Sequence, residues 1–159
     1  MSFSIDGKTV IVTGAANGIG AALARHFAEN GANVMCADID EKALKKDLGE
    51  SADDSNVRYF AGDLREKLTL ANLLSATVDA FDRVDVLVNA SRQMATTDPL
   101  DMDDETVDKL LQQNLMTSLR LSQMVAKRMI KQDEEQDHEF AGTIINLSSI
   151  AARLTQPEL

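Results

Sequence analysis

Several residue types that mark particular protein classes are scarce in this chain. The single cysteine, Cys36, excludes a disulfide within the chain and, because it lies inside an apolar run, indicates a buried thiol. The two histidines, His26 and His138, have no further ligand residues in view, so we expect no metal site. No apolar stretch approaches the roughly 20 residues of a membrane span, and we expect no membrane association.

Basic residues are few relative to acidic ones. The chain has 16 lysines and arginines against 26 aspartates and glutamates, a formal net charge of -10 at pH 7. Nucleic-acid phosphates and anionic lipids both attract a basic surface, so this balance argues against nucleic acid as a partner. The N-terminal segment MSFSIDGKTVIVTG has neither the basic start nor the apolar stretch of a secretion signal, and we expect a cytoplasmic protein.

Five short apolar runs alternate with longer segments of helical periodicity. The runs are KTVIVTG (8–14), ANVMCADID (32–40), VRYFAGD (57–63), VDVLVNA (84–90) and GTIINLSS (142–149). Several are apolar at consecutive positions, which is typical of strands covered on both faces in a parallel sheet. The pattern predicts an α/β fold, a doubly wound parallel sheet with strand order 3-2-1-4-5.

The longest helical segment follows the fourth run. We expect it to begin near Asp103 or Asp104. Its apolar positions include Val107, Leu110, Leu111, Leu115, Leu119, Val125 and Met129. The charged stretch KQDEEQDHEF (131–140) comes next, and we interpret it as a solvated loop after that helix.

The first apolar run leads into TGAANGIG, which places Gly14, Gly18 and Gly20 at a strand-to-helix turn. Glycines at such a turn allow tight backbone geometry, let the backbone approach a diphosphate, and let helix and strand pack closely. The helix N-terminus then presents free N–H groups to the diphosphate. The segment lacks the Lys-Ser/Thr ending of a P-loop, which argues against a nucleoside triphosphatase.

Asp38 ends the second run, 18 positions after Gly20. A carboxylate at this place accepts hydrogen bonds from both hydroxyls of an adenosine ribose and repels a 2′-phosphate. No Arg or Lys in the glycine turn attracts such a phosphate, so the sequence predicts NAD rather than NADP as the cofactor. The alternative is that Asp38 caps the next helix or faces solvent, although Asp40 is better placed for the cap.

Five motifs, in this order, resemble the short-chain dehydrogenase/reductase family. They are TGAANGIG (13–20), GDL (62–64), DVLVNA (85–90), QQNLMTSLRLSQ (112–123) and GTIINLSS (142–149). The resemblance implies a Rossmann-like fold and a nicotinamide cofactor, with Asp63 in contact with its adenine. The cofactor-binding residues that the resemblance and the turn together predict are Gly14, Asn17, Gly18, Ile19, Gly20, Asp38, Ile39, Asp63, Leu64, Asn89 and Ala90.

The resemblance also implies a hydride transfer between nicotinamide and a secondary alcohol or ketone, with Tyr, Lys, Ser and Asn as catalytic groups. Ser149 matches the serine, because the family uses the second Ser of Asn-x-Ser-Ser and strand alternation puts Ser148 on the opposite face. Asn114 matches the helix asparagine that holds a water in the proton path. The structural alternatives are a strand-end serine bonded to backbone and a helix amide bonded to a neighbouring strand.

The Tyr-x-x-x-Lys pair that the resemblance implies after Ser149 does not occur in this sequence. The single tyrosine, Tyr59, belongs to the third run, and no lysine follows Lys131. We therefore expect one cofactor-binding domain over 1–159 that is incomplete at its C-terminus before the last strands and is inactive by itself. We expect the full-length protein to be a homodimer or homotetramer.

Two other functions stay open at this point. One is an NAD-binding module or defective paralogue without catalysis, which the absence of the Tyr-x-x-x-Lys pair favours. The other is a non-redox enzyme on the same scaffold, such as a dehydratase or epimerase. The glycine spacing fits the simple dehydrogenases better.

One departure from the family pattern affects the predicted site. The family usually reads Asn-Asn-Ala-Gly after the fourth strand, and this chain reads Asn89, Ala90, Ser91 and Arg92. Glycine tolerates backbone angles that arginine does not. Arg92 therefore either points outward or shapes the entrance for substrate.

Overall fold

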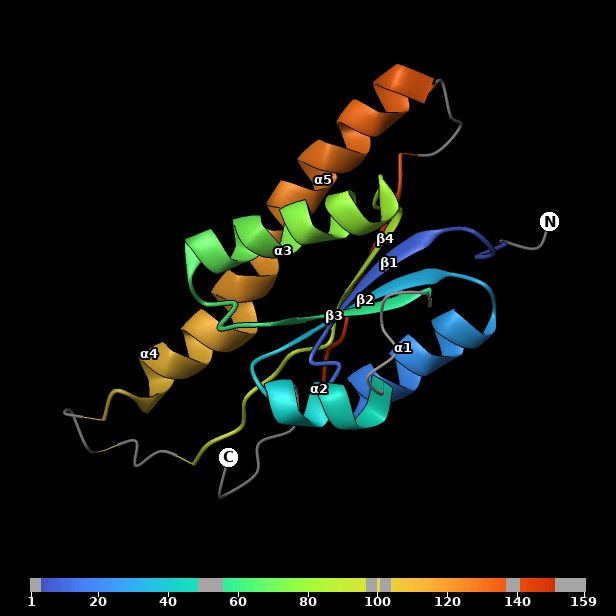
Figure 1. Cartoon of the computed structure of the whole chain (residues 1–159). Helices are drawn as coiled ribbons and strands as arrows, with labels where there is room; N and C mark the ends of the chain where they lie inside the picture. Colours follow the sequence, from blue (N-terminus) through green and yellow to red (C-terminus); the bar gives the residue numbers. More distant parts are fainter. Residues whose placement is uncertain (1–3, 49–55, 97–99, 101–103, 137–140, 151–159) are drawn as a thin grey trace.

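Five parallel strands form one sheet in the order β3-β2-β1-β4-β5 (Figure 1). The computed structural model describes residues 4–48, 56–96, 100, 104–136 and 141–150. The strands are β1 (Thr9–Thr13), β2 (Asn33–Asp38), β3 (Val57–Ala61), β4 (Val86–Asn89) and β5 (Thr143–Asn146). The doubly wound sheet and its predicted strand order are confirmed.

Helices cover both faces of the sheet (Figure 1). The elements between the strands are α1 (Gly18–Glu29), α2 (Glu41–Leu48), α3 (Lys67–Phe81), α4 (Thr106–Leu111), η1 (Gln112–Met116) and α5 (Thr117–Gln136). Helices α1 and α2 lie against one face, and α3 and α5 lie against the other (Figure 1). Crossovers of this kind place every carboxyl end of a parallel strand at the same edge of the sheet.

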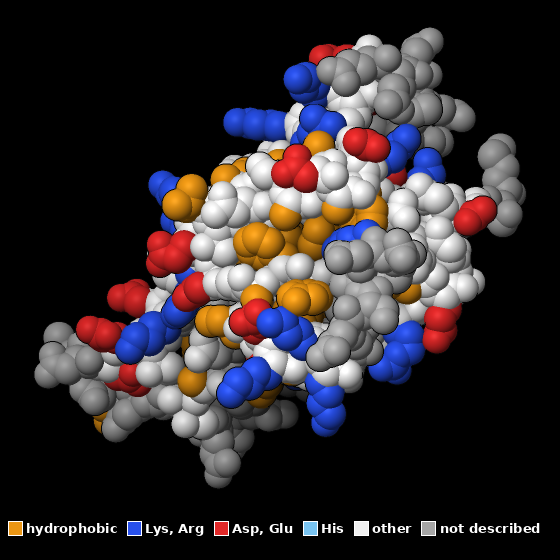
Figure 2. Space-filling view, viewed as in Figure 1, with side chains coloured by type: hydrophobic (Ala, Val, Ile, Leu, Met, Phe, Trp, Pro, Cys, Tyr) orange, Lys and Arg blue, Asp and Glu red, His pale blue; other side chains and the backbone are white. Residues whose placement is uncertain are grey.

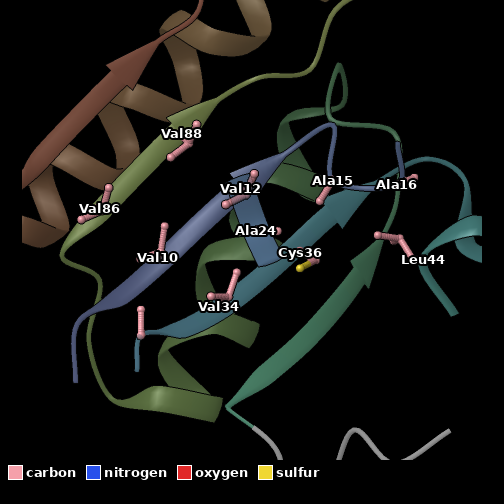
Figure 3. Packing of buried hydrophobic residues seen from close by; sticks show 11 residues of the cluster. Val10, Val12, Ala15, Ala16, Ala24, Val34, Cys36, Leu44, Val86 and Val88 are labelled. Carbon is pink, nitrogen blue, oxygen red and sulfur yellow. The ribbon is translucent and has the colours of Figure 1, made fainter. Parts of the chain in front are cut away.

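The two faces of β1 belong to two separate cores. Val10 and Val12 point toward α1 and pack in a cluster with Cys36, drawn in Figure 3. Ile11 points the other way and packs with the α3 and α5 side. All three β1 side chains are fully buried, as the two-sided apolar pattern of the first run predicts. The remaining members of the second core include Met35, Leu70, Leu73, Leu87, Leu121, Val125 and Met129.

The predicted long helix differs from the observed one in two ways. It begins at Thr106, and a π-helical turn, η1, interrupts it between α4 and α5. At this turn both the backbone N–H and the hydroxyl of Thr117 donate to the carbonyl of Gln112, the hydroxyl over 2.9 Å. Apolar periodicity alone does not distinguish a π turn from an α turn, because each keeps its apolar side chains on one face.

The interpretation of residues 131–140 as a loop is wrong for its first part. Helix α5 continues to Gln136, so the charged stretch starts inside the helix. Gln132 is buried there, with both ends of its amide bonded to the backbone of Val84 at 2.9 Å. Composition predicted exposure, but a tertiary contact places this amide in the interior.

The two edge strands are less covered than the strands between them. Side chains of β3 are mostly half-buried, and apolar side chains show along this edge between α3 and α2 (Figure 2). On the opposite edge, Ile145 of β5 is 39% exposed and Leu147 is 45% exposed. The central strands β1 and β4 are buried along their whole length.

Candidate functional site

The glycine turn connects β1 to α1 at the carboxyl edge of the sheet. Gly14 and Gly18 have φ angles of 69° and 53°, in the left-handed region that favours glycine. A Cβ added to Gly14 would lie 2.8 Å from the Cα of Ser91, and a Cβ added to Gly20 would overlap the carbonyl oxygen of Gly14. The turn is therefore tight at Gly14 and Gly20, whereas a Cβ added to Gly18 would meet nothing within 4 Å, so a diphosphate could approach the backbone there.

Asn17 forms the N-cap position of α1 without a capping side chain. Its backbone is extended, and its carboxamide makes no capping hydrogen bond. Ile19, in the first turn of α1, is 62% exposed. No acidic side chain lies in the first helical turn, so the positive end of the helix is not neutralised from within α1. An anionic group fits this end of the helix.

Asp38 turns back toward the glycine turn. Its Oδ2 accepts a hydrogen bond from the N–H of Ala16 over 3.1 Å, and its Oδ1 accepts one from the N–H of Asp40 over 3.0 Å. Asp40 in turn caps α2 by accepting the N–H of Ala43 over 3.0 Å. Asp40, not Asp38, therefore caps α2, and the Asp38 carboxylate lies beside the glycine turn. Ile39 between them is 66% exposed.

Thr13 joins the glycine turn to the loop after β4, a role that the sequence analysis did not identify. Its buried hydroxyl oxygen accepts the N–H groups of Ala90 and Ser91, each over 3.1 Å, and donates to the carbonyl of Val88 over 3.4 Å. The sequence feature that could have indicated this role is the position of Thr13 directly before Gly14, the first glycine of the turn. Only the strand order reveals its partners, which lie more than 70 positions away.

Asn89 and Ala90 lie where β4 ends. The Asn89 amide nitrogen donates to Ser122 Oγ over 3.0 Å and to Asn146 Oδ1 over 2.9 Å, so this buried side chain links β4 to α5 and β5. Ala90 is half-buried in the core next to the turn. Both residues are therefore part of the carboxyl edge at which the glycine turn and Asp38 also lie.

Arg92 does not require the backbone freedom of the glycine it replaces. Asp82 is the one non-glycine residue with a positive φ in the described ranges, so the Arg92 backbone lies in an ordinary region. The Arg92 side chain is exposed, and its Nη1 lies 3.0 Å from Met94 Sδ. The sequence left two outcomes open for Arg92, pointing outward or shaping the entrance for substrate. In the structure the Arg92 side chain points to the surface.

Asn114 lies in the π turn and holds the loop that follows β4. Its Oδ1 accepts the N–H of Gln93 over 2.7 Å, and its Nδ2 donates to the carbonyl of Gln93 over 2.9 Å. Gln113 beside it donates to Ser91 Oγ over 2.8 Å. The structural alternative for Asn114 was a bond to a neighbouring strand. The observed partner is instead the loop after β4, and the bond occupies both polar atoms of the amide.

Ser149 lies beyond the end of β5 and is exposed. Because β5 ends at Asn146, strand alternation does not decide between Ser148 and Ser149, and that argument from the sequence does not apply. The register pairs Asn146 with Asn89, which puts the segment after β5 at the same edge as the loop after β4.

Asp63 and Leu64 follow β3 at this edge. Leu64 is buried, with 5% exposed. Asp63 is engaged by the guanidinium of Arg65, and hydrogen bonds from Arg65 hold the pKa of the Asp63 carboxyl below its usual value. Asp38, Asp63 and the glycine turn thus come from three strands that are neighbours in the sheet.

A sheet of this order with a glycine turn at its carboxyl edge defines a Rossmann-like α/β protein. A family model described as short chain dehydrogenase matches residues 8–159, and the chain belongs to this family. Members of the family are oxidoreductases that use a nicotinamide cofactor, NAD or NADP. Within the described ranges, no helix combines the length and apolar character needed to cross a bilayer.

Similar proteins include two named polyol dehydrogenases and one solved structure. A D-threitol dehydrogenase of Mycolicibacterium smegmatis is 34% identical over 155 residues, covering 94% of this chain and 55% of the relative. An NAD-dependent glycerol dehydrogenase of Listeria innocua is 29% identical over 150 residues, covering 94% of this chain and 56% of the relative. The crystal structure of gox2181 superposes with a TM-score of 0.83 at 27% identity, covering 96% and 57%. The chain thus spans little more than half the length of these relatives.

Proposed function

We propose that residues 1–159 form one dinucleotide-binding domain of an oxidoreductase and that the dinucleotide is NAD. The observation that carries the proposal is the 3.1 Å hydrogen bond from the N–H of Ala16 to Asp38 Oδ2. It brings a carboxylate suited to ribose hydroxyls against the backbone suited to a diphosphate. The NAD-dependent glycerol dehydrogenase among the similar proteins supports the choice of cofactor.

Each group at the carboxyl edge has a role in this proposal. The backbone of the glycine turn and the N-terminus of α1 hold the diphosphate, while Asp38 accepts the ribose hydroxyls and repels a 2′-phosphate. NAD, when bound, supplies the hydride acceptor for a secondary alcohol, or in its reduced form the hydride for a ketone. Ser149 holds the substrate oxygen by a hydrogen bond, and Asn114 fixes the loop that borders the nicotinamide end. The dehydrogenases named for D-threitol and glycerol support an alcohol as substrate.

Substitution of Asp38 tests the cofactor assignment. In Asp38→Ala we expect NAD to bind about 10- to 100-fold more weakly, since one charged acceptor for two hydroxyls is lost. NADP binding should stay unchanged or improve, because the repelling charge is also lost. Isothermal titration calorimetry with each dinucleotide measures both constants.

Asp40→Ala is the matched control for that experiment. It removes a carboxylate two residues away and costs the α2 cap about 1 kcal/mol of stability, but it leaves the ratio of NAD to NADP affinity unchanged. If Asp38→Ala lowered the affinities for NAD and NADP by the same factor, the assignment of NAD would be contradicted.

We also propose that the 159-residue chain alone binds cofactor without turnover. Its single tyrosine, Tyr59, lies on β3 at one edge of the sheet, and Ser149 follows β5 at the other edge. Four strand spacings of about 4.8 Å separate these edges by roughly 19 Å, too far for one proton path. Incubation with NAD and glycerol or D-threitol should give no rise in the absorbance of reduced cofactor.

The whole protein is proposed to be a homodimer or homotetramer in the cytoplasm. Exposed apolar side chains on the helix that runs through α4, η1 and α5 support the assembly, and they are Val107, Leu111, Leu115 and Leu119. The free, buried thiol of Cys36 supports a reducing compartment.

A further inference from the structure

The loop after β4 packs directly on the glycine turn. A Cβ added to Gly14 would lie 2.8 Å from the Cα of Ser91 and 2.9 Å from its backbone nitrogen. Thr13 holds the same residue, because its hydroxyl oxygen accepts the N–H of Ser91 over 3.1 Å. The position of Ser91 therefore sets how this loop lies against the backbone that is proposed to hold the diphosphate.

The side chain of Ser91 is bonded to the π turn. Gln113 Nε2 donates to Ser91 Oγ over 2.8 Å, and both residues are half-buried. Partial burial reduces the competition of water for this hydrogen bond. Ser91 is thus bonded to β1 through its backbone N–H and to η1 through its hydroxyl, so two elements fix one residue of the loop.

Two successive residues of the π turn bond to this loop. Gln113 bonds to Ser91, and Asn114 bonds to the backbone of Gln93 through both polar atoms of its amide. Successive side chains of an α-helix point about 100° apart, and a π turn, which holds more residues, brings their directions closer together. Of the two side chains, Gln113 is the one that holds the residue packed on Gly14.

We propose that Gln113 is a positioning residue for the nicotinamide half of the dinucleotide and that it acts through Ser91. This rests on the proposed NAD site. Strand β1 lies between β2 and β4. A dinucleotide with its adenosine ribose on Asp38 of β2 and its diphosphate at the turn after β1 therefore continues toward the loop after β4.

The bond between Gln113 and Ser91 keeps this loop in the position that binds the dinucleotide. Without the bond, the loop occupies that position for a smaller fraction of the time, and the apparent affinity falls by the same fraction. Only a ligand that reaches the loop is affected. ADP shares the adenosine and the diphosphate with NAD but has no nicotinamide half, so its affinity does not depend on the bond.

The test compares the binding of NAD and ADP to the 159-residue chain by isothermal titration calorimetry. In Gln113→Leu we expect NAD to bind about 5-fold more weakly, as the loss of one neutral hydrogen bond allows, and ADP affinity to stay within about 2-fold. Ser91→Ala removes the other partner of the bond and should have the same effect. It is the smaller change, and it keeps the test valid if Gln113→Leu does not fold.

A double-mutant cycle shows whether Gln113 acts through Ser91. The chain with both substitutions should bind NAD about 5-fold more weakly, as each single variant does, because all three lose the same bond. A loss of about 25-fold, the product of the two single losses, would mean that the side chains act independently and would overturn the inference.

Gln112→Leu is the matched control for Gln113→Leu. Gln112 precedes Gln113 in the same π turn and is exposed. The side-chain hydrogen bonds from η1 to the loop that the structure describes come from Gln113 and Asn114. The control therefore removes a carboxamide from the same turn, and it should leave the affinities for NAD and ADP unchanged.

The outcomes separate a failure of this inference from a failure of the proposed function. If Gln113→Leu and Ser91→Ala bind NAD as tightly as the unmodified chain or more tightly, Gln113 does not position the loop, and the NAD site is unaffected. If both variants lose the same factor for NAD and ADP, the bond is only structural. If the unmodified chain binds neither NAD nor ADP, the proposed function itself is wrong.

Discussion

Cys36 lies on β2 with its thiol enclosed by the core cluster under α1 (Figure 3). Burial raises the pKa of this thiol from 9.0 to about 12. The folded chain therefore keeps the thiol neutral at pH values where the unfolded chain ionises it. Stability from this group is complete below pH 9 and is lost as the pH rises toward 12.

We expect the free energy of unfolding to fall by about 1 kcal/mol between pH 8 and pH 10 because of Cys36. Urea denaturation at the two pH values measures this change. Cys36→Val is the control, since it keeps an apolar side chain at this position and has no group that ionises. Other titrating groups contribute equally to both proteins. If the two lose the same free energy over this range, the thiol is not shielded as the structure implies.

The site residues at the turn were predicted from local features of the sequence. Gly14, Gly18 and Asp38 follow from the backbone geometry and charge that a diphosphate and a ribose require. The partners of Thr13 and Asn114 were not accessible, because both side chains bind the loop after β4, which is distant along the chain. Asp63 was predicted as a site residue, but its bond to the guanidinium of Arg65, only two positions away, was not.

At the scale of elements, α5 is joined to the turn between α3 and β4. Gln132 accepts the N–H of Val84 and donates to its carbonyl, each over 2.9 Å. One turn earlier, Arg128 donates to Gln132 Oε1 and to the carbonyl of Asp82, each over 3.0 Å. Asp82 has a φ of 65° at the C-cap of α3, so this turn is already conformationally restricted. The helix thereby fixes where β4 begins.

Gln132→Leu should destabilise the chain by about 3 kcal/mol. The substitution leaves a buried N–H and a buried carbonyl of Val84 without partners, and each such group costs about 1–3 kcal/mol. Gln123→Leu on the exposed side of the same helix is the control and should change stability by less than about 0.5 kcal/mol. Urea denaturation followed by circular dichroism measures both. If both substitutions changed the free energy of unfolding by equally small amounts, the two hydrogen bonds between Gln132 and Val84 would make no net contribution to stability.

Strands were predicted better than helix boundaries, and the reason is physical. A strand covered on both faces must be apolar at successive positions, so a short stretch of sequence is enough to predict it. Residues of the π turn at Gln112–Met116 bind the loop after β4, and Gln132, in the helical start of 131–140, binds the backbone of Val84. Local composition does not predict such contacts. A polar stretch whose side chains bond to buried backbone has the same composition as one whose side chains bond to water.

At the scale of the whole molecule, one apolar surface remains on the α4–η1–α5 helix. Val107, Leu111, Leu115 and Leu119 are 54%, 49%, 56% and 45% exposed, and they recur every four residues. Because a π turn holds more residues than an α turn, η1 keeps this four-residue spacing closer to one face. The sequence analysis gave these residues as apolar positions of the long helix. The fold leaves them exposed, because the sheet side of the helix uses Leu121, Val125 and Met129.

A charge placed in the middle of this surface tests the proposed assembly. If two copies pair through the stripe, Leu115→Glu puts two unpaired carboxylates into an apolar contact, and the dissociation constant should rise by at least about 100-fold. Light scattering coupled to size-exclusion chromatography should then report the monomer mass where the unmodified protein reports a dimer or tetramer. Leu68→Glu, on a 72% exposed leucine of α3 outside the stripe, should leave the mass unchanged. A monomeric unmodified protein at micromolar concentration, or an unchanged oligomer in Leu115→Glu, would remove the stripe as the contact between copies.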